Sequence, residues 1–388
     1  MSTVNFTVAR ADTKNVLDEN GTISSVAANT PAFEYNANGT YKGLLVESAS
    51  ENLCLQSEDI TTTWTSTNAT ITTNATTAPD GTATADKLND DNGTGTGQVR
   101  AQQSISTIAG NTYTASVFLK ADQLAFAALG AQDADGASAY TQFFGLSGNG
   151  TLGTPTAGID DSTITAYPNG WYKCSITFTQ TDADGFTFRI YVADGISNYD
   201  VDLDGTSSIF VWGAQVEEGT VASSYIPTTT TSVTRAKDDI SLTGASTYIG
   251  QTAGTVYLEA TIDNIVANAN LITVSDGSDD NIVRITFNAS GDMRMYVKAS
   301  TSAIINDVET IAAGTYKFAI VYSSGDTRVY RNGVQLSSSS TALTFGATVD
   351  KIDIGQSFVA TGQAENWIKA FAFYKRALTD AEAQILTN

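Results

Sequence analysis

The sequence predicts an all-β protein built from two tandem antiparallel β-sandwiches and a short C-terminal helix. Three observations support this fold class. The chain has 388 residues, more than a single hydrophobic core usually serves. Charged residues make up 16% of it and hydrophobic residues 41%, with 32 glycines, so there is core material but little that is typical of long charged helices. Apolar residues also recur at every second position in many short segments, which is the period of a half-buried strand.

Residues 1–45 form a segment without a clean hydrophobic period. Short apolar patches alternate there with the turn sequences DENG and NANG. We expect this N-terminal arm either to add an ordinary edge strand with loops or to bind a neighbouring surface.

The first sandwich is expected over residues 46–232. Its strand segments alternate apolar and polar residues, which buries one face of a sheet and leaves the other in water. Stretches rich in Gly, Asn, Asp and Pro separate these segments and accept turn geometry. We predict that Cys54 and Cys174 are buried free thiols, with a disulfide as the alternative. The strand segments are YTASVFL (113–119), YKCSITF (172–178), FTFRIYV (186–192) and SIFVWGAQVEEG (208–219), in which Trp212 is assigned to the core.

The boundary between the sandwiches is expected within about ten residues of Thr230. The Thr-rich run there is too polar and uniform for a core strand. The charge balance also changes nearby, because residues 1–232 contain 8 basic and 25 acidic residues, whereas residues 233–388 contain 12 and 16.

The second sandwich is expected over residues 233–388. It contains the segments TVYLEATI, LITVS, IVRITFNASGDMRMYV and TYKFAIVYSSGDTRVYRNGVQLS. Asn332-Gly333 between two apolar runs is a strong hairpin signal and predicts antiparallel pairing. A helix is predicted at the end of the chain, where Thr379 as N-cap and Glu382 form a capping box.

Charge and composition exclude several classes of function. The net charge of −21 repels phosphate backbones, so we expect no nucleic-acid partner. The chain has no histidine, which excludes Ser-His-Asp triads and His-ligated metals. No apolar run is long enough to span a bilayer and the first residues lack an apolar signal segment, so we expect synthesis in the cytoplasm as a soluble protein without membrane insertion.

Two groups of segments carry resemblances to known families. FTVARADTKNVLDENGTI, YKGLLVESASENLCLQSED, NGWYKCSITF and WGAQVEEGTVASSYIPT together resemble bacteriophage virion proteins of the tail and tail-fibre type, in which a short arm precedes a carbohydrate-binding-module-like jelly roll. GTVYLEATI, GDTRVYRNGVQL and WIKAFAFYKRALTDAEAQIL are similar to concanavalin A-like lectin/glucanase domains of the laminin-G type. The resemblances imply a jelly roll over 46–232 and a concanavalin A-like sandwich over 233–388. They also imply that the arm packs on the module or on a neighbouring virion subunit.

Catalysis by carboxylates is the enzyme chemistry that the concanavalin A-like resemblance leaves open. Glucanases of that fold usually carry their acids on one strand as Glu-x-Asp-x-x-Glu. No Glu in this sequence is followed two positions later by Asp. We therefore expect no enzyme, and no catalytic or cofactor-binding residue is assigned.

Calcium is the one metal that the sequence suggests. Asp200, Asp202 and Asp204 before Gly205 match the start of a D-x-D-x-D-G loop. The twelfth position would be Val211 instead of a bidentate Glu, which rules out a true EF-hand, and an acidic turn is the alternative. Weaker carboxylate groups occur at Asp133 and Asp135 and at Asp276, Asp279 and Asp280.

Exposed aromatic rings would be the usual mark of sugar recognition. The candidates near loops or on irregular strand faces are expected to be packing residues instead, because aromatic side chains mostly pack. They are Trp64, Tyr140, Trp171, Tyr296 and Tyr330.

The sequence thus predicts a non-enzymatic phage virion protein, part of a tail fibre or similar appendage, that binds host cell-surface glycan by many weak contacts. Its expected partners are other virion proteins, host polysaccharide and further copies of itself, and its expected location is the virion. A purely structural subunit that decorates the capsid or connects tail parts is the alternative, and a polysaccharide depolymerase is a third.

Overall fold

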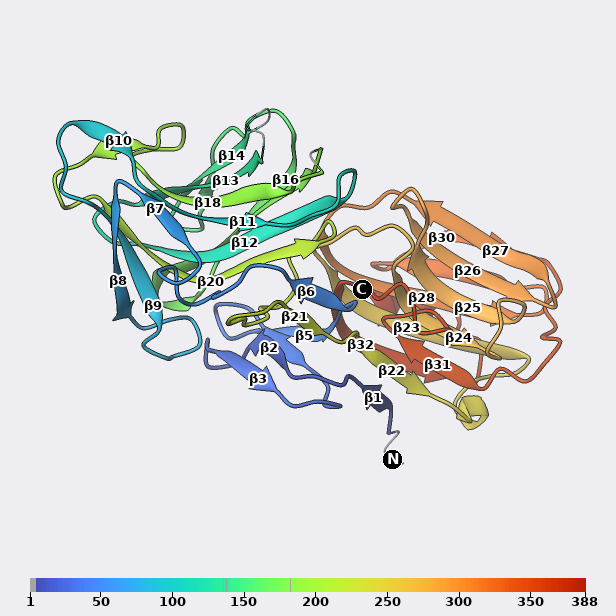
Figure 1. Cartoon of the computed structure of the whole chain (residues 1–388). Coiled ribbons are helices and arrows are strands. Elements are labelled where there is room, and N and C mark those ends of the chain that lie inside the picture. Colours follow the sequence, from blue (N-terminus) through green and yellow to red (C-terminus); the bar gives the residue numbers. More distant parts are fainter. Residues whose placement is uncertain (1–4, 135, 137–138, 182) are drawn as a thin grey trace.

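The computed structural model describes residues 5–134, 136, 139–181 and 183–388. It contains two antiparallel β-sandwiches and one short α-helix, which confirms the predicted fold class. Figure 1 shows the sandwiches as two lobes of an elongated molecule, with strands of the N-terminal arm at their junction.

The N-terminal sandwich consists of two six-stranded sheets. One has the order β15 (Thr151–Leu152), β14 (Ala139–Gly145), β13 (Phe126–Asp133), β18 (Phe186–Ala193), β11 (Arg100–Ile105) and β7 (Thr65–Thr67). The other has the order β16 (Ile159–Ala166), β17 (Trp171–Thr179), β12 (Thr112–Ala121), β20 (Ser208–Glu218), β9 (Ala85–Asp90) and β8 (Ala69–Thr76).

The core of this sandwich is built from alternate residues of its strands. Phe188 and Ile190 of β18 and Val117 of β12 are fully buried between the two sheets. Trp212, which the sequence assigns to the core, is 1% exposed. It lies in a separate cluster on the outer side of β12 and β20, to which Leu17 of the arm also belongs. The arm therefore closes a second apolar layer on this sheet.

The C-terminal sandwich consists of two seven-stranded sheets, each of which includes strands of the arm. The first has the order β1 (Thr7–Ala9), β22 (Asp239–Leu242), β31 (Lys351–Ile354), β24 (Asn270–Ser275), β25 (Ile282–Phe287), β26 (Met293–Ala299) and β27 (Ser302–Glu309). The second has the order β30 (Val334–Ser339), β29 (Thr327–Arg331), β28 (Gly314–Ser323), β23 (Ala253–Ile262), β32 (Asn366–Tyr374), β5 (Tyr41–Val46) and β4 (Phe33–Tyr35).

The arm is an integral part of the C-terminal sandwich. β1 and β4 are edge strands, as one of the two expectations had it, and β5 pairs with β32 inside the sheet. Leu44 and Val46 of β5 contribute to the C-terminal core. Gly43 has φ +147°, and a Cβ at this position would lie 2.7 Å from the Cβ of Trp367. A side chain at Gly43 would therefore separate the arm from β32.

Three smaller two-stranded sheets connect these layers. β2 (Lys14–Leu17) pairs with β3 (Ile23–Val26) within the arm. β6 (Ser50–Asn52) pairs with β21 (Val233–Arg235), which joins the chain on both sides of the N-terminal sandwich. β10 (Thr96–Gln98) pairs with β19 (Asp200–Asp202) at the far end of that sandwich. The remaining elements are two 3₁₀ turns, Pro168–Gly170 and Ala245–Thr247, and the helix α1 (Asp380–Thr387).

Several local predictions are confirmed. Asn332 and Gly333 both have positive φ and connect β29 to β30 as a tight hairpin. Thr379 and Glu382 form the capping box at the start of α1. Both cysteines are free and buried. In the described part of the chain, no helix has the length and apolar character needed to cross a bilayer.

Candidate functional site

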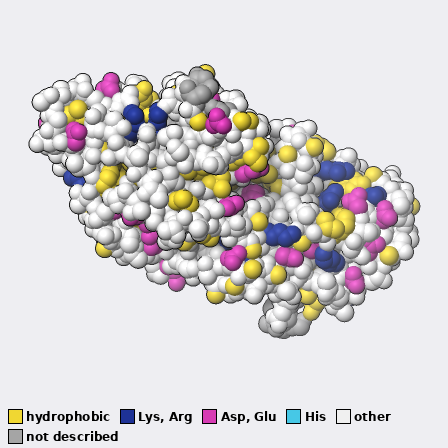
Figure 2. Space-filling model, viewed as in Figure 1, with side chains coloured by type: hydrophobic (Ala, Val, Ile, Leu, Met, Phe, Trp, Pro, Cys, Tyr) yellow, Lys and Arg dark blue, Asp and Glu magenta, His cyan; other side chains and the backbone are white. Residues whose placement is uncertain are grey.

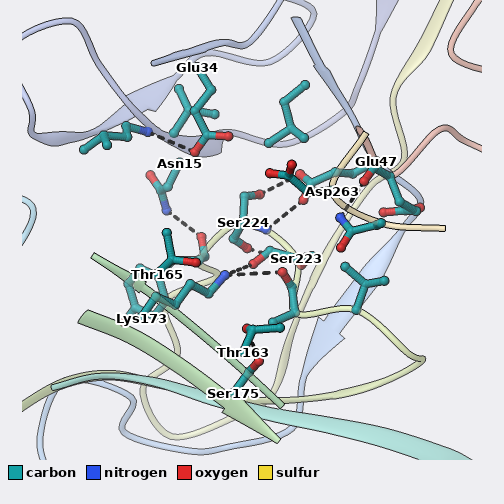
Figure 3. Close-up of a pocket in the computed structure, with 18 of the residues that line it drawn as sticks. Asn15, Glu34, Glu47, Thr163, Thr165, Lys173, Ser175, Ser223, Ser224 and Asp263 are labelled. Atoms are coloured by element: carbon teal, nitrogen blue, oxygen red, sulfur yellow. Dashed lines mark hydrogen bonds between the residues drawn. The ribbon is translucent and has the colours of Figure 1, made fainter. Parts of the chain in front are cut away.

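A polar cavity of about 200 Å³ lies at the junction between the two sandwiches (Figure 3). Thr163, Thr165 and Ser175 of β16 and β17 line one side, and Glu34 of the arm lies on the other. The loop 219–225, which follows β20, runs between them. The cavity is thus built from both sandwiches and from the arm.

Lys173 fixes the loop 219–225 to β17. Its Nζ donates hydrogen bonds to the carbonyls of Ser223 at 2.6 Å and Ala222 at 3.3 Å. Burial lowers the pKa of Lys173, because water is excluded from its charged form. The amine is therefore engaged by the backbone and does not face the cavity as a free cation.

A network of buried charges ties the arm to the segment that enters the C-terminal sandwich. Asp238 accepts hydrogen bonds from Arg10 at 2.7 Å and from Lys14 at 2.6 Å, and all three side chains are at most 1% exposed. Glu47 pairs with Lys14 at 2.9 Å and with Arg235 at 3.1 Å. Burial alone would raise the pKa of Glu47, but the charges of Arg235 and Lys14 hold it well below its usual range.

The other carboxylates at the cavity also hold parts of the frame. Glu34 accepts a hydrogen bond from Trp367 Nε1 at 2.5 Å, and burial raises its pKa. Glu365 accepts one from the backbone N–H of Ser48 at 2.7 Å. Burial, followed by the negative charge of Glu47, raises the pKa of Glu365 to about 7. These contacts give the cavity a structural task, which is to set the positions of the two sandwiches.

A second candidate site is the outward face of the sheet that contains β11, β13 and β18. Because Ala101, Leu129 and Ile190 point into the core, the alternate residues point outward. The outward residues form a polar surface that we call the arginine face. It consists of Arg100, Gln102, Gly130, Gln132, Thr141, Thr187, Arg189 and Tyr191.

The strand register places two arginines side by side on this face. Arg100 lies opposite Tyr191, and Arg189 lies opposite both Gln102 and Gly130. Arg100 donates from Nε to Gln102 at 3.0 Å, and its Cζ lies 5.8 Å from the ring centroid of Tyr191. Arg189 Nη1 lies 3.5 Å from the hydroxyl of Tyr191. Both guanidinium groups are thus arranged around one tyrosine.

Three stacked rings adjoin the arginine face. Phe143 and Tyr191 lie on β14 and β18, on either side of Ala128 of β13. The ring of Tyr199 stacks on Phe143 at 5.5 Å and on Tyr191 at 5.1 Å, so it fills the space above Ala128. The stack holds Tyr191 in place and gives the polar surface an aromatic border.

The predicted calcium residues lie at the far end of the N-terminal sandwich. Asp200 and Asp202 are exposed on β19, and Asp204 Oδ1 accepts hydrogen bonds from the N–H and hydroxyl of Thr206. These hydrogen bonds lower the pKa of Asp204. Among the residues that the structure describes, no group of three or more carboxylate, Cys or His side chains is placed to hold a metal ion.

Calcium at this turn stays a prediction with a direct measurement. If Asp200, Asp202 and Asp204 bind calcium, EDTA lowers the melting temperature and added CaCl₂ restores it. A melting temperature that is unchanged by EDTA excludes the ion.

The weaker carboxylate groups have other tasks. Asp276 accepts hydrogen bonds from Ser278 and Asn281 within its own turn. Asp279 and Asp280 pair with Lys298 at 3.4 and 3.3 Å. Asp133 is buried, and Asp135 lies outside the described residues.

The aromatic residues that the sequence placed among packing residues are packed. Each of Trp64, Tyr140, Trp171, Tyr296 and Tyr330 is less than 9% exposed.

The arginine face was not identified from the sequence. The alternation of FTFRIYV does place Arg189 and Tyr191 outward, and this was the available signal. That Arg100 lies next to them depends on the pairing of β11 with β18, which are distant in the sequence.

Comparisons with known proteins find a family match for the C-terminal part. Residues 235–384 match the family described as "Concanavalin A-like lectin/glucanases superfamily". No curated protein sequence matches the chain.

Solved structures with partial similarity include three carbohydrate-associated domains. The Ruminococcus gnavus IT-sialidase CBM40 has 16% identity and a TM-score of 0.32, and the match covers 39% of this chain and 93% of that one. Domain 4 of AbnA, an extracellular arabinanase from Geobacillus stearothermophilus in complex with arabinotriose, has 14% identity and a TM-score of 0.33, over 44% and 82%. The binding domain of Botulinum Neurotoxin DC in complex with SialylT has 16% identity and a TM-score of 0.30, over 39% of each chain. The family match and the two seven-stranded sheets show that the C-terminal sandwich is similar to concanavalin A-like domains.

Proposed function

We propose that this protein is a non-enzymatic subunit of a bacteriophage tail fibre or similar virion appendage that binds host cell-surface glycan. The observation that carries glycan binding is the arginine face, a polar sheet surface bordered by stacked aromatic rings. Sugar hydroxyls are recognised by amide, hydroxyl and guanidinium groups of the kind found there. The family match of residues 235–384, which includes lectins, supports the same function.

The contacts of the cavity carboxylates support the non-enzymatic part of the proposal. A glycosidase needs one carboxyl group as acid and a second as base or nucleophile, both facing the sugar. Glu34 and Glu47 each use both oxygens in hydrogen bonds or ion pairs to the frame. The assignment to a virion appendage rests on the resemblance to tail and tail-fibre proteins.

The test is to incubate the purified chain with immobilised surface polysaccharides from a panel of bacteria. Retention of protein and release of new reducing ends are measured in the same tube. We expect retention without cleavage. Bovine serum albumin on the same supports is the control for non-specific adhesion. Release of reducing ends would overturn the non-enzymatic assignment. If none of the polysaccharides retains the protein, glycan binding is overturned.

One surface favours a purely structural subunit as the second candidate. Phe33 and Tyr41, on the edge hairpin of the arm, are 47% and 38% exposed. They border an apolar groove of about 470 Å³ that Phe6 and Phe371 also line. Exposed aromatic surface of this kind is typical of protein interfaces. This candidate moves ahead if no polysaccharide retains the protein.

A further inference from the structure

The N-terminal sandwich has few basic residues, and they are unevenly distributed over it. Residues 47–232 contain five basic and 21 acidic residues. Figure 2 shows few basic side chains on this lobe and more on the C-terminal lobe, where they alternate with acidic ones. Two of the five, Arg100 and Arg189, lie on the arginine face, and the others are Lys87, Lys120 and Lys173.

Neither arginine of this face is neutralised by the protein. Within the described part of the chain, no carboxylate lies within 4.0 Å of Arg100 or Arg189, whereas Lys87 pairs with Asp122 at 2.7 Å. The Nε of Arg189 is buried and has no hydrogen-bond partner. Guanidinium groups stay charged at all pH values that proteins meet, and a buried donor without a partner costs free energy. The face therefore has positive charge that no carboxylate of the described residues neutralises.

Both guanidinium groups are held in place before any ligand arrives. Arg100 donates to Gln98 at 2.7 Å as well as to Gln102, so its plane is fixed. Arg189 contacts Tyr191, and the ring of Tyr191 is held in place by stacking on Tyr199. Planar guanidinium forks in fixed positions match the two oxygens of a carboxylate.

We infer that the arginine face binds the carboxylate of an acidic sugar, such as a uronic or sialic acid, within a host polysaccharide. This inference rests on the glycan-binding function proposed above and names its ligand class. Gly130 has no side chain, which leaves room for the ring of Tyr191 beside Arg189, and the neighbouring Gln132, Thr141 and Thr187 have groups that can bind sugar hydroxyls. The 21 acidic residues of the sandwich repel dense polyanions, so a chain with one carboxylate per sugar or fewer fits better than a polyphosphate.

The test uses the full chain and pairs of ligands that differ only in charge. Bacterial capsular polysaccharides rich in uronic or sialic acid are immobilised before and after carbodiimide-mediated reduction of their carboxyl groups to alcohols. Neutral polysaccharides and poly-glutamate are immobilised alongside. We expect binding to the acidic forms to fall by at least about tenfold on carboxyl reduction, and binding to poly-glutamate to be weaker than to the acidic glycans.

Matched variants locate the site. In Arg100→Gln/Arg189→Gln we expect the affinity for the acidic forms to fall by at least about tenfold. The control Lys120→Gln/Lys375→Gln removes the same charge elsewhere and should change affinity by less than about twofold, because its lysines lie away from the face. Circular dichroism and melting curves establish that both double variants are folded, and the single variants Arg100→Gln and Arg189→Gln replace the double variant if it is not.

The outcomes separate the inference from the proposed function. Equal binding to native and carboxyl-reduced glycans overturns the acidic-sugar inference and leaves glycan binding intact. An unchanged affinity in the arginine variants places the site elsewhere and also overturns it. Binding to poly-glutamate as tight as to the acidic glycans assigns the face to acidic peptides instead. Retention on no polysaccharide, acidic or neutral, rejects the proposed function itself.

Discussion

Replacing Asp238 with Asn is expected to lower the free energy of unfolding by about 4 kcal/mol. Asp238 is the shared partner of Arg10 and Lys14, and its Oδ2 also accepts the backbone N–H of Glu47. The neutral amide leaves Arg10 buried without its counter-charge and leaves Glu47 as the remaining carboxylate partner of Lys14, so the cost of burying the two cations is no longer offset. The measurement is the urea dependence of intrinsic fluorescence at pH 7.

The release of the arm is the second readout of the Asp238→Asn variant. Arg10 and Lys14 lie on the arm, so we expect trypsin to cut the variant within residues 1–46 much faster than the unsubstituted protein. Glu19→Gln removes a negative charge from an exposed position of the same arm and serves as the control. If Asp238→Asn changes the unfolding free energy no more than Glu19→Gln does, the buried network does not stabilise the fold.

The second large effect is a loss of stability as the pH rises from 5 to 8. The pKa of Glu365 is about 7 in the folded protein, against an ordinary value of 4.5. At pH values between 4.5 and 7, Glu365 keeps its proton in the folded protein but has released it in the unfolded chain. The unfolding free energy therefore falls with rising pH, and the stabilisation present below pH 4.5 is lost as the pH passes 7. At 1.36 kcal/mol per pKa unit, Glu365 alone contributes about 3 kcal/mol.

The variant Glu365→Gln isolates this contribution. Its neutral side chain does not titrate, so we expect urea titrations from pH 5 to pH 8 to show a loss smaller by about 2.5 kcal/mol than in the unsubstituted protein, because part of the effect lies below pH 5. Some pH dependence remains, because burial also raises the pKa of Asp353 to about 6. Asp353→Asn reports that part separately. Parallel stability curves for Glu365→Gln and the unsubstituted chain would contradict the assignment to Glu365.

The layered architecture could be predicted because its signal is local. Each strand segment alternates over five or more residues, so period and turn composition are visible within a short window. The helix and the Asn332-Gly333 hairpin were predictable for the same reason, since capping and turn geometry depend on adjacent residues. The concanavalin A-like sandwich was accessible through resemblance of whole segments.

The position of the arm could not be derived in this way. β1 has three residues and β4 has three, too few to show a period, and their partners lie elsewhere in the chain. Charge gave the opposite indication, because Arg10 and Lys14 would normally be assigned to the surface. Their burial depends on Asp238, which is remote in the sequence and adjacent only in the fold.

The pairing of β5 with β32 also determines the order in which the molecule can be completed during synthesis. β32 begins 320 residues after β5 ends (Val46 to Asn366), so β5 stays without this partner strand until the N-terminal sandwich and most of the C-terminal one have been synthesised. The N-terminal sandwich has all its strands much earlier and can fold first. Until then the apolar side chains of Leu44 and Val46, which belong to the C-terminal core, stay exposed to solvent. A truncated product that ends before β32 therefore exposes apolar side chains of the arm. Cellular quality control can distinguish it from the folded protein by this exposed apolar surface.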